Sequence, residues 1–396
     1  MRFILRIVKL LIQLLKKCRK RLFTGLDKVA SSLACSRPKS GVALIRLDAI
    51  GDFIICLDSA KEFRRIYPEQ RITLIANAAW AEMAQVLPYW DEVWPVDVKA
   101  FVWNLFYRFF LIHKVSKANF EIAVQPTFSR VFLIGDSIVR VSRANHRIGS
   151  IGDLSNIDVQ DKRISDRWYT RLLPANKEPL MELDRNAEFI RHLSGRAFSA
   201  SLPRWNYQAV LRSELQPRKP YFILFPGASW KGRMWPTRHF VQVAQSLCVQ
   251  FGWQVVLCGA KNEWTVCQNI LDGISGWGLN LAGRTNLIEL ADLIRDARLL
   301  IANETSAVHI AAAVSTPAVC ILGGGHYGRF MPYPEQLDGI KPVVAARLMS
   351  CFGCNWRCTQ PHDAGGPVPC ISAVSVEQVL DCARKALDMA TCVPAH

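Results

Sequence analysis

The sequence predicts an α/β protein with two domains of similar size, each built on a parallel sheet. Apolar runs with the length of buried strands alternate with helical patterns between residues 41 and 149, and the alternation restarts at residue 221. A less regular stretch with several prolines, 150–218, separates the two series. The 396 residues, 50% of them hydrophobic, are enough to bury two cores.

The first series alternates short apolar runs with longer helical segments that end at proline or polar residues. We expect strands at 41–47, 72–76, 93–96, 121–125 and from 147 onwards, and helices at 54–67, 78–87, 101–117 and 132–143.

The second series repeats this pattern after a helix at 185–193. We expect strands at 221–225, 254–258, 299–302 and 318–322, and helices at 236–251, 287–295, 305–314 and 376–389. Open α/β sheets bind ligands beyond the carboxyl ends of their strands, so the expected site is the cleft between two facing sheets.

The predicted organisation follows from these elements. A terminal helix at 1–23 and a connector at 24–40 precede a first domain at 41–205. A linker at 206–218 leads to a second domain at 219–375, which contains a cysteine-rich loop at 349–371. The chain ends in a helix and tail at 376–396.

The net charge of +16 is concentrated at the start of the chain, where residues 1–23 contain eight Lys and Arg and no acid. On a helical wheel the cations share one face and the apolar residues the other. We expect this helix to lie on an anionic membrane, on the inner face of the cytoplasmic membrane. The alternative is a helix that packs on its own domain or on a partner.

A membrane span and a signal peptide both fit the basic segment less well. No apolar run there is long enough to span a bilayer, and the cations continue past the apolar stretch, unlike in a signal peptide. No nucleic-acid-binding motif accompanies the charge, so nucleic acid is not an expected partner. Without an export signal, disulfides are not expected among the 13 cysteines.

Four loops at predicted strand ends contain polar or glycine residues suited to an anionic ligand. Asp52 opens a helix after the first strand, where simple capping is the alternative. The loop after the strand at 221–225 offers small residues and cations that suit a phosphate, although it is not a Walker A loop. Its candidate residues are Gly227, Ser229, Lys231 and Arg233.

The remaining loops lie in the same half of the chain. Thr305 and Ser306 would present hydroxyls and free N–H groups at a helix start, with Glu304 placed to accept sugar hydroxyls. His309 follows on that helix, where packing is the alternative to ligand binding. Glycines end two further strands and would allow close backbone approach to a ligand: Gly259, Gly323, Gly324 and Gly325. Together these loops favour a nucleoside diphosphate.

The chain resembles glycosyltransferase family 9, the heptosyltransferase family of lipopolysaccharide assembly, over about residues 41–372. The resemblance is carried by five segments: IRLDAIGDFIICLDSAKEFRRIYP, FPGASWKGRMWPTRHF, VVLCGAKNE, NLAGRTNLIELADLIRDARLLIANETSAVHIAAA and TPAVCILGG. It implies the GT-B architecture, with two Rossmann-like domains, the acceptor on the first and the donor on the second.

The resemblance also implies inverting transfer from a nucleoside diphosphate sugar to a lipopolysaccharide or other lipid-linked glycan, with no metal required. It makes Asp52 the catalytic base, and it places the basic loop around Lys231 and Arg233 and the helix start at Thr305 on the donor. The family usually has Asp-Thr-Gly or Asp-Ser-Gly where this chain has Glu304-Thr305-Ser306. The longer carboxylate shifts the sugar contact by roughly one bond length, so the donor sugar stays open.

Two further clusters have alternative interpretations. Cys351, Cys354, Cys358 and Cys370 have a spacing compatible with a structural zinc or iron–sulfur site, and free buried thiols are the alternative. Arg140, Arg143 and Arg147 suit an anionic acceptor, and a solvated basic helix face is the alternative.

Two other functions fit parts of the pattern. An epimerase-like GT-B enzyme would need an acid or base near the donor sugar, such as His309 or His326. A non-catalytic, membrane-bound glycan-binding protein would neither bind nucleotide nor need Asp52.

Overall fold

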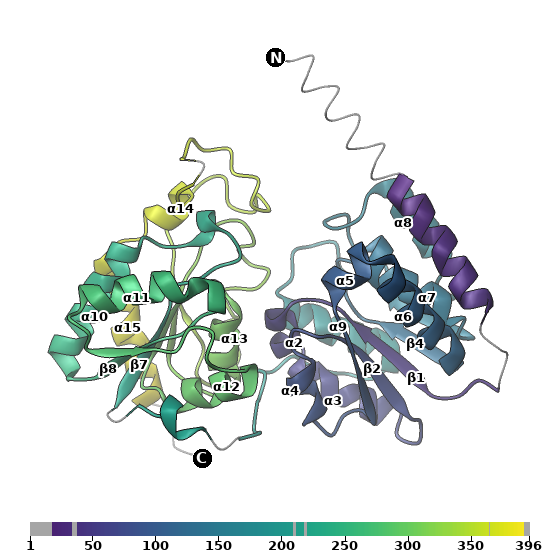
Figure 1. The fold of residues 1–396 in the computed structure, drawn as a ribbon, viewed down its shortest axis with the longest axis horizontal. Coiled ribbons are helices and arrows are strands. Elements are labelled where there is room, and N and C mark those ends of the chain that lie inside the picture. Colours follow the sequence, from purple (N-terminus) through teal and green to yellow (C-terminus); the bar gives the residue numbers. More distant parts are fainter. Residues whose placement is uncertain (1–17, 34–37, 209–210, 218–219, 364, 392–396) are drawn as a thin grey trace, which may run out of the picture. The chain divides into compact units, whose positions relative to one another are not determined.

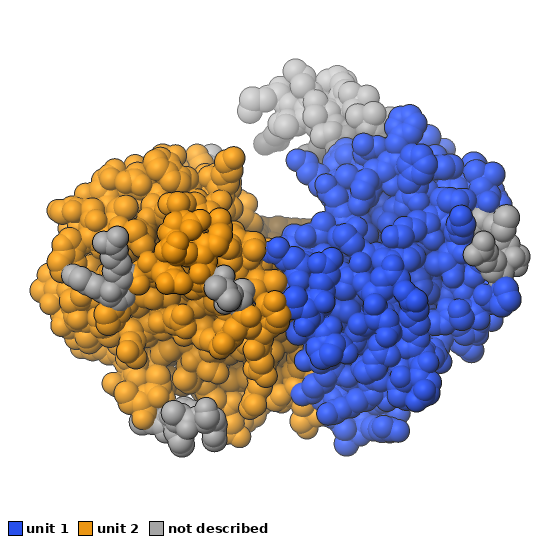
Figure 2. Space-filling view, turned by 60° about the horizontal axis from the view of Figure 1, so that its bottom comes forward, with its two compact units in different colours: residues 1–49, 60–175, 186–198 blue, residues 50–59, 176–185, 199–396 orange. Residues whose placement is uncertain are grey.

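The computed structural model describes residues 18–33, 38–208, 211–217, 220–363 and 365–391. The chain divides into two compact units (Figure 2). Unit 1 comprises residues 1–49, 60–175 and 186–198, and unit 2 comprises 50–59, 176–185 and 199–396. The expected division at 206–218 is therefore too simple, because two short segments from the first half of the chain pack with the second.

Unit 1 contains a six-stranded parallel sheet in the order β3-β2-β1-β4-β5-β6. Its strands are β1 (Val42–Arg46), β2 (Ile72–Asn77), β3 (Glu92–Val96), β4 (Ile122–Gln125), β5 (His146–Ser150) and β6 (Arg171–Leu173). Val42 pairs with Ile72 on one side and with Ile122 on the other, so the strand order reverses at β1. The carboxyl ends of β1 and β4 therefore form a topological switch point, where doubly wound sheets bind ligands.

Helices lie on both faces of this sheet (Figure 1). They are α3 (Leu57–Ile66), α4 (Ala81–Gln85), α5 (Val98–Trp103), α6 (Leu105–Ala118), α7 (Ser137–Ser142), α8 (Val159–Asp166) and α9 (Glu182–Ser194), with a π-helical turn η1 (Phe132–Asp136). The single helix expected at 101–117 is broken at Asn104, whose side chain accepts a hydrogen bond from the N–H of Tyr107 and caps α6.

Residues 18–32 form a helix on unit 1, where the sequence analysis expected a connector from residue 24. Its only acid, Asp27, is fully buried and receives hydrogen bonds from Arg108 and Arg140. A buried carboxylate without a partner would be costly. The pairs of Asp27 with the two arginines therefore stabilise the helix in this position. Residues 1–17 of the expected membrane helix lie outside the described residues.

Unit 2 repeats the topology of unit 1, with strand order β12-β11-β10-β7-β8-β9. Its strands are β7 (Tyr221–Phe225), β8 (Gln254–Leu257), β9 (Gly278–Asn280), β10 (Leu300–Asn303), β11 (Ala318–Ile321) and β12 (Val343–Ala345). Leu300 pairs with Ile223 and with Ala318, so the switch point lies between β7 and β10. Apolar side chains of these strands, including Phe222, Leu224 and Ile301, are completely buried in the core.

The helices of unit 2 also cover both faces of its sheet (Figure 1). They are α2 (Ile50–Ile55), α10 (Thr237–Phe251), α11 (Trp264–Gly273), α12 (Leu287–Asp296), α13 (Ser306–Ala313), α14 (Pro369–Ser372) and α15 (Val376–Thr391), with a 3-10 turn η3 (Lys231–Arg233). The helix expected at 54–67 is two helices, because the chain turns at Cys56. No helix within the described residues is both long and apolar enough to cross a membrane.

Candidate active site

The loop after β7 is fixed to the neighbouring strand at the switch point of unit 2. Asn303, the last residue of β10, is completely buried. Its side-chain amide donates to the carbonyl of Pro226 at 2.6 Å and its carbonyl accepts the N–H of Trp235 at 3.1 Å. Asn303 thus holds both ends of the phosphate-binding loop predicted from the sequence, a role the sequence analysis did not assign.

Of the two cations in that loop, Arg233 is turned into the site. One guanidinium nitrogen donates to the backbone carbonyl of Glu304 at 2.6 Å and lies 3.3 Å from its carboxylate, while the other donates to Ser229 at 3.1 Å. Lys231 is exposed. The structure therefore brings together Ser229, Arg233 and Glu304, and leaves Lys231 at the rim.

Glu304 lies at the carboxyl end of β10, and only 5% of the residue is exposed. Burial raises the pKa of its carboxyl group to about 7, an effect that the nearby Arg233 partly offsets. Oγ1 of Thr305 and Nε of Arg233 are buried without a hydrogen-bond partner among the described residues, and Oε2 of Glu304 has only the ion pair with Arg233 at 3.3 Å. Buried polar atoms are normally paired, so this arrangement indicates a site for a polar ligand.

Thr305 precedes the first turn of α13, and its side chain does not cap the helix. The N–H groups at this helix start, which include that of Ser306, carry the positive end of the helix dipole. Together with Arg233 they form an electropositive site beside the switch point, which suits a diphosphate. This agrees with the donor role expected for Thr305 and Ser306.

Asp52 lies in the first turn of α2, and this helix packs against α13 within unit 2. A Cβ added to the preceding Gly51 would lie 3.0 Å from Cδ2 of His309 and 3.8 Å from Cα of Ser306. The packing brings the helix that carries Asp52 to the start of α13. The sequence analysis placed Asp52 in the first domain, whereas by its contacts it belongs with the second unit.

His309 is a packing residue in this structure. It is buried, its Nδ1 lies 3.0 Å from the hydroxyl of Tyr333, and burial lowers its pKa to about 4. His326 is also engaged, since its Nε2 lies 2.7 Å from Oδ1 of Asn355 and its Nδ1 accepts the indole N–H of Trp356. Neither histidine is placed as the acid or base that an epimerase would need.

Gly227 and Gly259 make room for one half-buried carboxylate, that of Glu263. A Cβ on Gly227 would overlap Glu263, and one on Gly259 would lie 2.6 Å from Oε2 of Glu263. That oxygen accepts the N–H of Ala260 at 2.7 Å. These glycines therefore bring the loops after β7 and β8 together around Glu263, rather than being shown to approach a ligand directly.

The three-glycine loop is covered by the cysteine-rich loop. A Cβ on Gly324 would overlap Phe352, and Cβ atoms on Gly323 or Gly325 would overlap Trp356. The N–H of Gly324 donates to Sγ of Cys370 at 3.4 Å. The prediction that this loop presents bare N–H groups to the donor is therefore not supported, because loop packing occupies that space.

The cysteine-rich loop instead contributes one aromatic side chain, that of Trp356, to the candidate site. Trp356 adopts a left-handed backbone conformation, with φ of 58°, and its ring lies 4.8 Å from the Arg233 guanidinium carbon. This cation–π contact holds Arg233 in addition to its contacts with Glu304 and Ser229. A tryptophan distant in sequence carries no signal of such a role, and the sequence analysis missed it.

The four cysteines do not form a metal site in this structure. No group of three or more His, Cys, Asp or Glu that could hold a metal ion occurs in the part of the chain that is described. Burial raises the pKa of Cys370, and the neighbouring cysteines raise it further, which favours the protonated thiol. The predicted zinc or iron–sulfur site is therefore not formed by the residue positions seen here.

In unit 1, the loop after β1 is fixed by the residue that begins it. The carbonyl of Asp48 accepts hydrogen bonds from Asn77 and Trp80, at 2.9 and 3.0 Å. Its carboxylate pairs with Arg46 at 2.8 Å. This network anchors the loop that follows β1 within unit 1.

The arginines predicted to bind the acceptor serve structural roles in unit 1, at the end of the sheet where its strands begin. Arg140 pairs with Asp27 at 2.8 Å, and the guanidinium of Arg147 donates to the carbonyls of Trp168 and Ala144. Arg143 ends α7 with φ of 52° and is exposed. Arg147 begins β5, whereas Asp48 follows the end of β1. In a parallel sheet these positions lie at opposite ends of the strands, so Arg147 is not beside Asp48, and the acceptor role of these arginines stays a prediction.

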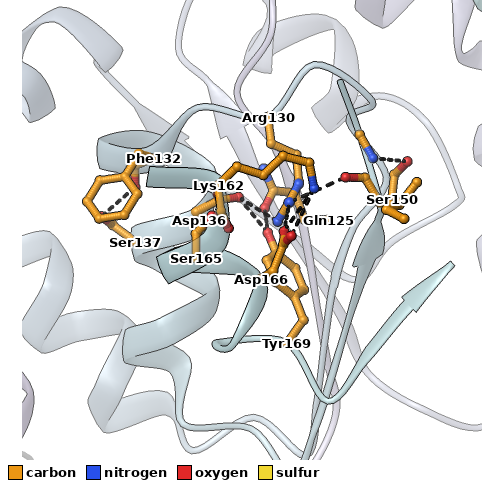
Figure 3. Close-up of polar contacts among 12 residues, drawn as sticks. Gln125, Arg130, Phe132, Asp136, Ser137, Ser150, Lys162, Ser165, Asp166 and Tyr169 are labelled. Atoms are coloured by element: carbon orange, nitrogen blue, oxygen red, sulfur yellow. Dashed lines mark hydrogen bonds and ion pairs between the residues drawn. The ribbon is translucent and has the colours of Figure 1, made fainter. Parts of the chain in front are cut away.

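A buried polar cluster in unit 1, near Gln125 at the end of β4, contains a further arginine, Arg130. Arg130, with 1% of its side chain exposed, lies 3.6 Å from Asp136 and also pairs with Asp166 (Figure 3). The hydroxyl of Tyr169 donates to Asp136 at 2.7 Å and to Gln125. Burial and the charge of Asp136 raise the pKa of Tyr169 well above its usual value, so it stays a neutral donor.

Comparison with known proteins agrees with the geometry of unit 2. Residues 183–347, which contain the Arg233 loop and the start of α13, match the family model described as glycosyltransferase family 9 (heptosyltransferase). The chain is similar to glycosyltransferase family 9 over these residues. It is 24% identical to lipopolysaccharide heptosyltransferase 2 of Salmonella typhimurium over 294 residues, which cover 69% of this chain and 80% of the relative.

Two solved structures share the fold of this chain. The E. coli ADP-heptose lps heptosyltransferase II matches with a TM-score of 0.63 and 19% identity, covering 88% of this chain and 98% of that structure. The glycosyl transferase family 9 protein from Veillonella parvula DSM 2008 matches with a TM-score of 0.66 and 16% identity, covering 89% and 99%. The two six-stranded sheets are thus the GT-B fold.

Proposed function

We propose that this enzyme is an inverting glycosyltransferase that moves a sugar from a nucleoside diphosphate donor to a lipopolysaccharide core or another lipid-linked surface glycan. The observation that carries the proposal is the convergence of Arg233, Ser229 and the start of α13 around buried polar atoms that lack partners within the described residues. The names of the Salmonella and E. coli relatives support heptose as the sugar, with another hexose-like sugar as the alternative.

In the proposed reaction, Asp52 accepts the proton of an acceptor hydroxyl while that oxygen attacks the anomeric carbon of the donor sugar. The new glycosidic bond forms as the bond from the anomeric carbon to the diphosphate oxygen breaks, with inversion at that carbon. Arg233 and the N–H groups at the start of α13 stabilise the charge that develops on the leaving diphosphate. The contact of Gly51 with α13 supports this assignment, because it brings the helix of Asp52 to the donor site.

The reaction as proposed uses side chains and backbone groups alone, as expected for this family. Metal analysis of anaerobically purified protein tests the sequence-based prediction of a structural metal at Cys351, Cys354, Cys358 and Cys370, which the positions of the described residues do not form. A metal-free protein with four reactive thiols would refute it.

We also propose that the enzyme works peripherally on the inner face of the cytoplasmic membrane, where a lipid-linked acceptor is accessible. The support is the cluster of eight cations without an acid in residues 1–23.

The decisive experiment compares the wild type with Asp52→Asn. A thermal-shift panel of nucleoside diphosphates first identifies the donor base. We then expect Asp52→Asn to bind that diphosphate with unchanged affinity and to lose nearly all transfer. An active Asn variant would refute the role of Asp52, and a wild type that binds no nucleoside diphosphate would refute the proposed function.

A further inference from the structure

The helix at 18–32 lies beside α5 and α6 on the surface of unit 1 (Figure 1). Three contacts along its length fix this arrangement. The guanidinium of Arg19 stacks 4.4 Å from the ring of Trp103, the carboxylate of Asp27 pairs with Arg108 at 2.7 Å, and the carbonyl of Ala30 lies 3.3 Å from Nδ1 of His113. The two segments therefore form one continuous surface, which we call the helical face of unit 1.

This face exposes large apolar side chains to solvent. Phe106 is 80% exposed, and Trp103 and Phe110 are each 66% exposed. Phe106 and Phe110 are four residues apart on α6 and so share one side of it. The neighbouring helix adds Leu22, Val29 and, directly after its end, Leu33, each more than half exposed and spaced at seven and four residues. A grouping of this kind indicates an interaction surface.

The exposed charges of the two segments have one sign. Residues 18–33 and 98–118 contain one acid, Asp27, and it is fully buried between Arg108 and Arg140. The exposed charged residues of these segments are all basic: Arg21, Lys28, Lys99, Lys114 and Lys117. Residues 1–17, which join this face at Cys18, add five cations and no acid to the sequence.

We propose that the helical face of unit 1 docks on an anionic lipid bilayer, with the aromatic side chains in the interface and the surrounding cations on lipid phosphates. Tryptophan and phenylalanine beside lysine and arginine, with no exposed acid in residues 18–33 and 98–118, are the composition of an interfacial membrane surface. The inference rests on the membrane association proposed above and names the surface that makes it, which the sequence analysis placed in residues 1–23 alone.

The test uses the full chain and sedimentation with vesicles of phosphatidylcholine, alone or mixed with phosphatidylglycerol. We expect the wild type to bind the mixed vesicles much more strongly than the neutral ones. Phe106→Ser combined with Phe110→Ser should weaken this binding at least about tenfold, because each ring loses its burial in lipid. Val249→Ser, which changes an equally exposed apolar residue on α10, is the matched control and should bind as the wild type does.

A second pair of substitutions tests the electrostatic part. Lys114→Glu combined with Lys117→Glu should weaken binding to mixed vesicles and leave the weak binding to neutral vesicles unchanged. Equal binding of the wild type to both vesicle types would refute the anionic part of the proposal.

The remaining outcomes separate this surface from the proposals on which it rests. A wild type that binds no vesicles would overturn both membrane association and this surface. Normal vesicle binding by the phenylalanine variant would overturn the surface alone. If the oligomeric state of that variant changed while its vesicle binding did not, the face would instead contact a second copy of the chain. Transfer to a detergent-solubilised acceptor should be the same in wild type and the phenylalanine variant. This assay measures transferase activity independently of vesicle binding, so failure of the proposed function can be told apart from failure of the proposed surface.

Discussion

Gly51 and His309 are in contact, so that a methyl group on Gly51 would come within 3.0 Å of the imidazole. The histidine is held in turn by Tyr333, 3.0 Å away. Through this contact α2, which carries the proposed base Asp52 in its first turn, packs on α13, whose start forms the proposed donor site. The distance between base and donor is thus set by packing within unit 2.

Gly51→Ala is therefore expected to reduce turnover. The added methyl group requires α2 or His309 to move by a few tenths of an ångström. Rates are sensitive to such shifts, since a misplacement of about 1 Å between reacting groups can cost roughly 100-fold. We expect kcat to fall by about tenfold or more, with the affinity for the nucleoside diphosphate within about twofold of wild type. Gly25→Ala, where an added Cβ meets nothing within 4 Å, is the control for activity on a soluble acceptor. A Gly51→Ala enzyme with wild-type kcat would show that this contact does not position the base.

Arg233→Ala and Lys231→Ala should differ strongly in their effects. Arg233 is fixed in the site by Ser229 and Glu304, whereas Lys231 is exposed. Removing one preorganised charge that stabilises a transition state typically costs 100- to 1000-fold in rate. We expect a loss of about 100-fold in kcat/KM for Arg233→Ala and less than about fivefold for Lys231→Ala, measured by steady-state kinetics. The reverse order would assign the donor phosphate to Lys231.

Glu304 should give the ligand-free protein a pH-dependent stability. Its pKa is about 7 in the folded chain and near 4.5 when unfolded. Below pH 4.5 both states are protonated, whereas between 4.5 and 7 only the unfolded state loses its proton, so stability falls as the pH rises and is constant above 7. The loss is roughly 3 kcal/mol at most.

The measurement is the free energy of unfolding of wild type minus that of Glu304→Gln, from pH 4 to pH 8. The difference isolates this carboxyl group, because the other titrating groups are common to both proteins. It should decrease as the pH rises to 7 and then level off. A difference that does not change with pH would contradict the raised pKa.

Asp27→Ala should destabilise unit 1 by about 3–5 kcal/mol, because it leaves the buried Arg108 and the partly exposed Arg140 without their shared carboxylate. Urea unfolding measures the loss, and limited proteolysis should show earlier cleavage within 18–32. Asp161→Ala is the matched control, since it removes the partly exposed pair with Lys20 and should cost no more than about 1 kcal/mol. Equal effects of the two substitutions would show that the buried triad does not hold the helix.

Local patterns in the sequence were sufficient to predict most strands. β1, β7, β10 and β11 are short apolar runs bounded by glycine, proline or polar residues, and such runs are buried in parallel sheets. Short elements were missed, including β9 and β12, because three residues contain too little periodic pattern to identify.

The candidate site was predicted where function depends on a residue's place at a strand end, as for Arg233, Glu304 and Thr305. It was not predicted where function depends on partners distant in the chain. Arg140 suits an anionic ligand by its chemistry, but Asp27, 113 residues earlier, already binds it. Trp356 lies far from Arg233 in sequence, and only folding brings their side chains together.

By itself the sequence determined two series of alternating strands and helices, the loops at their carboxyl ends and the concentration of positive charge in the first residues. These features are local, since they depend on periodicity, turn residues and composition over a few positions. Only the tertiary structure decided which cation faces the site, that α2 packs with the second unit, and that the three glycines accommodate Trp356 and Phe352. Those outcomes depend on which distant side chains compete for the same space and the same buried charges, and contacts of that kind exist only once the chain has folded.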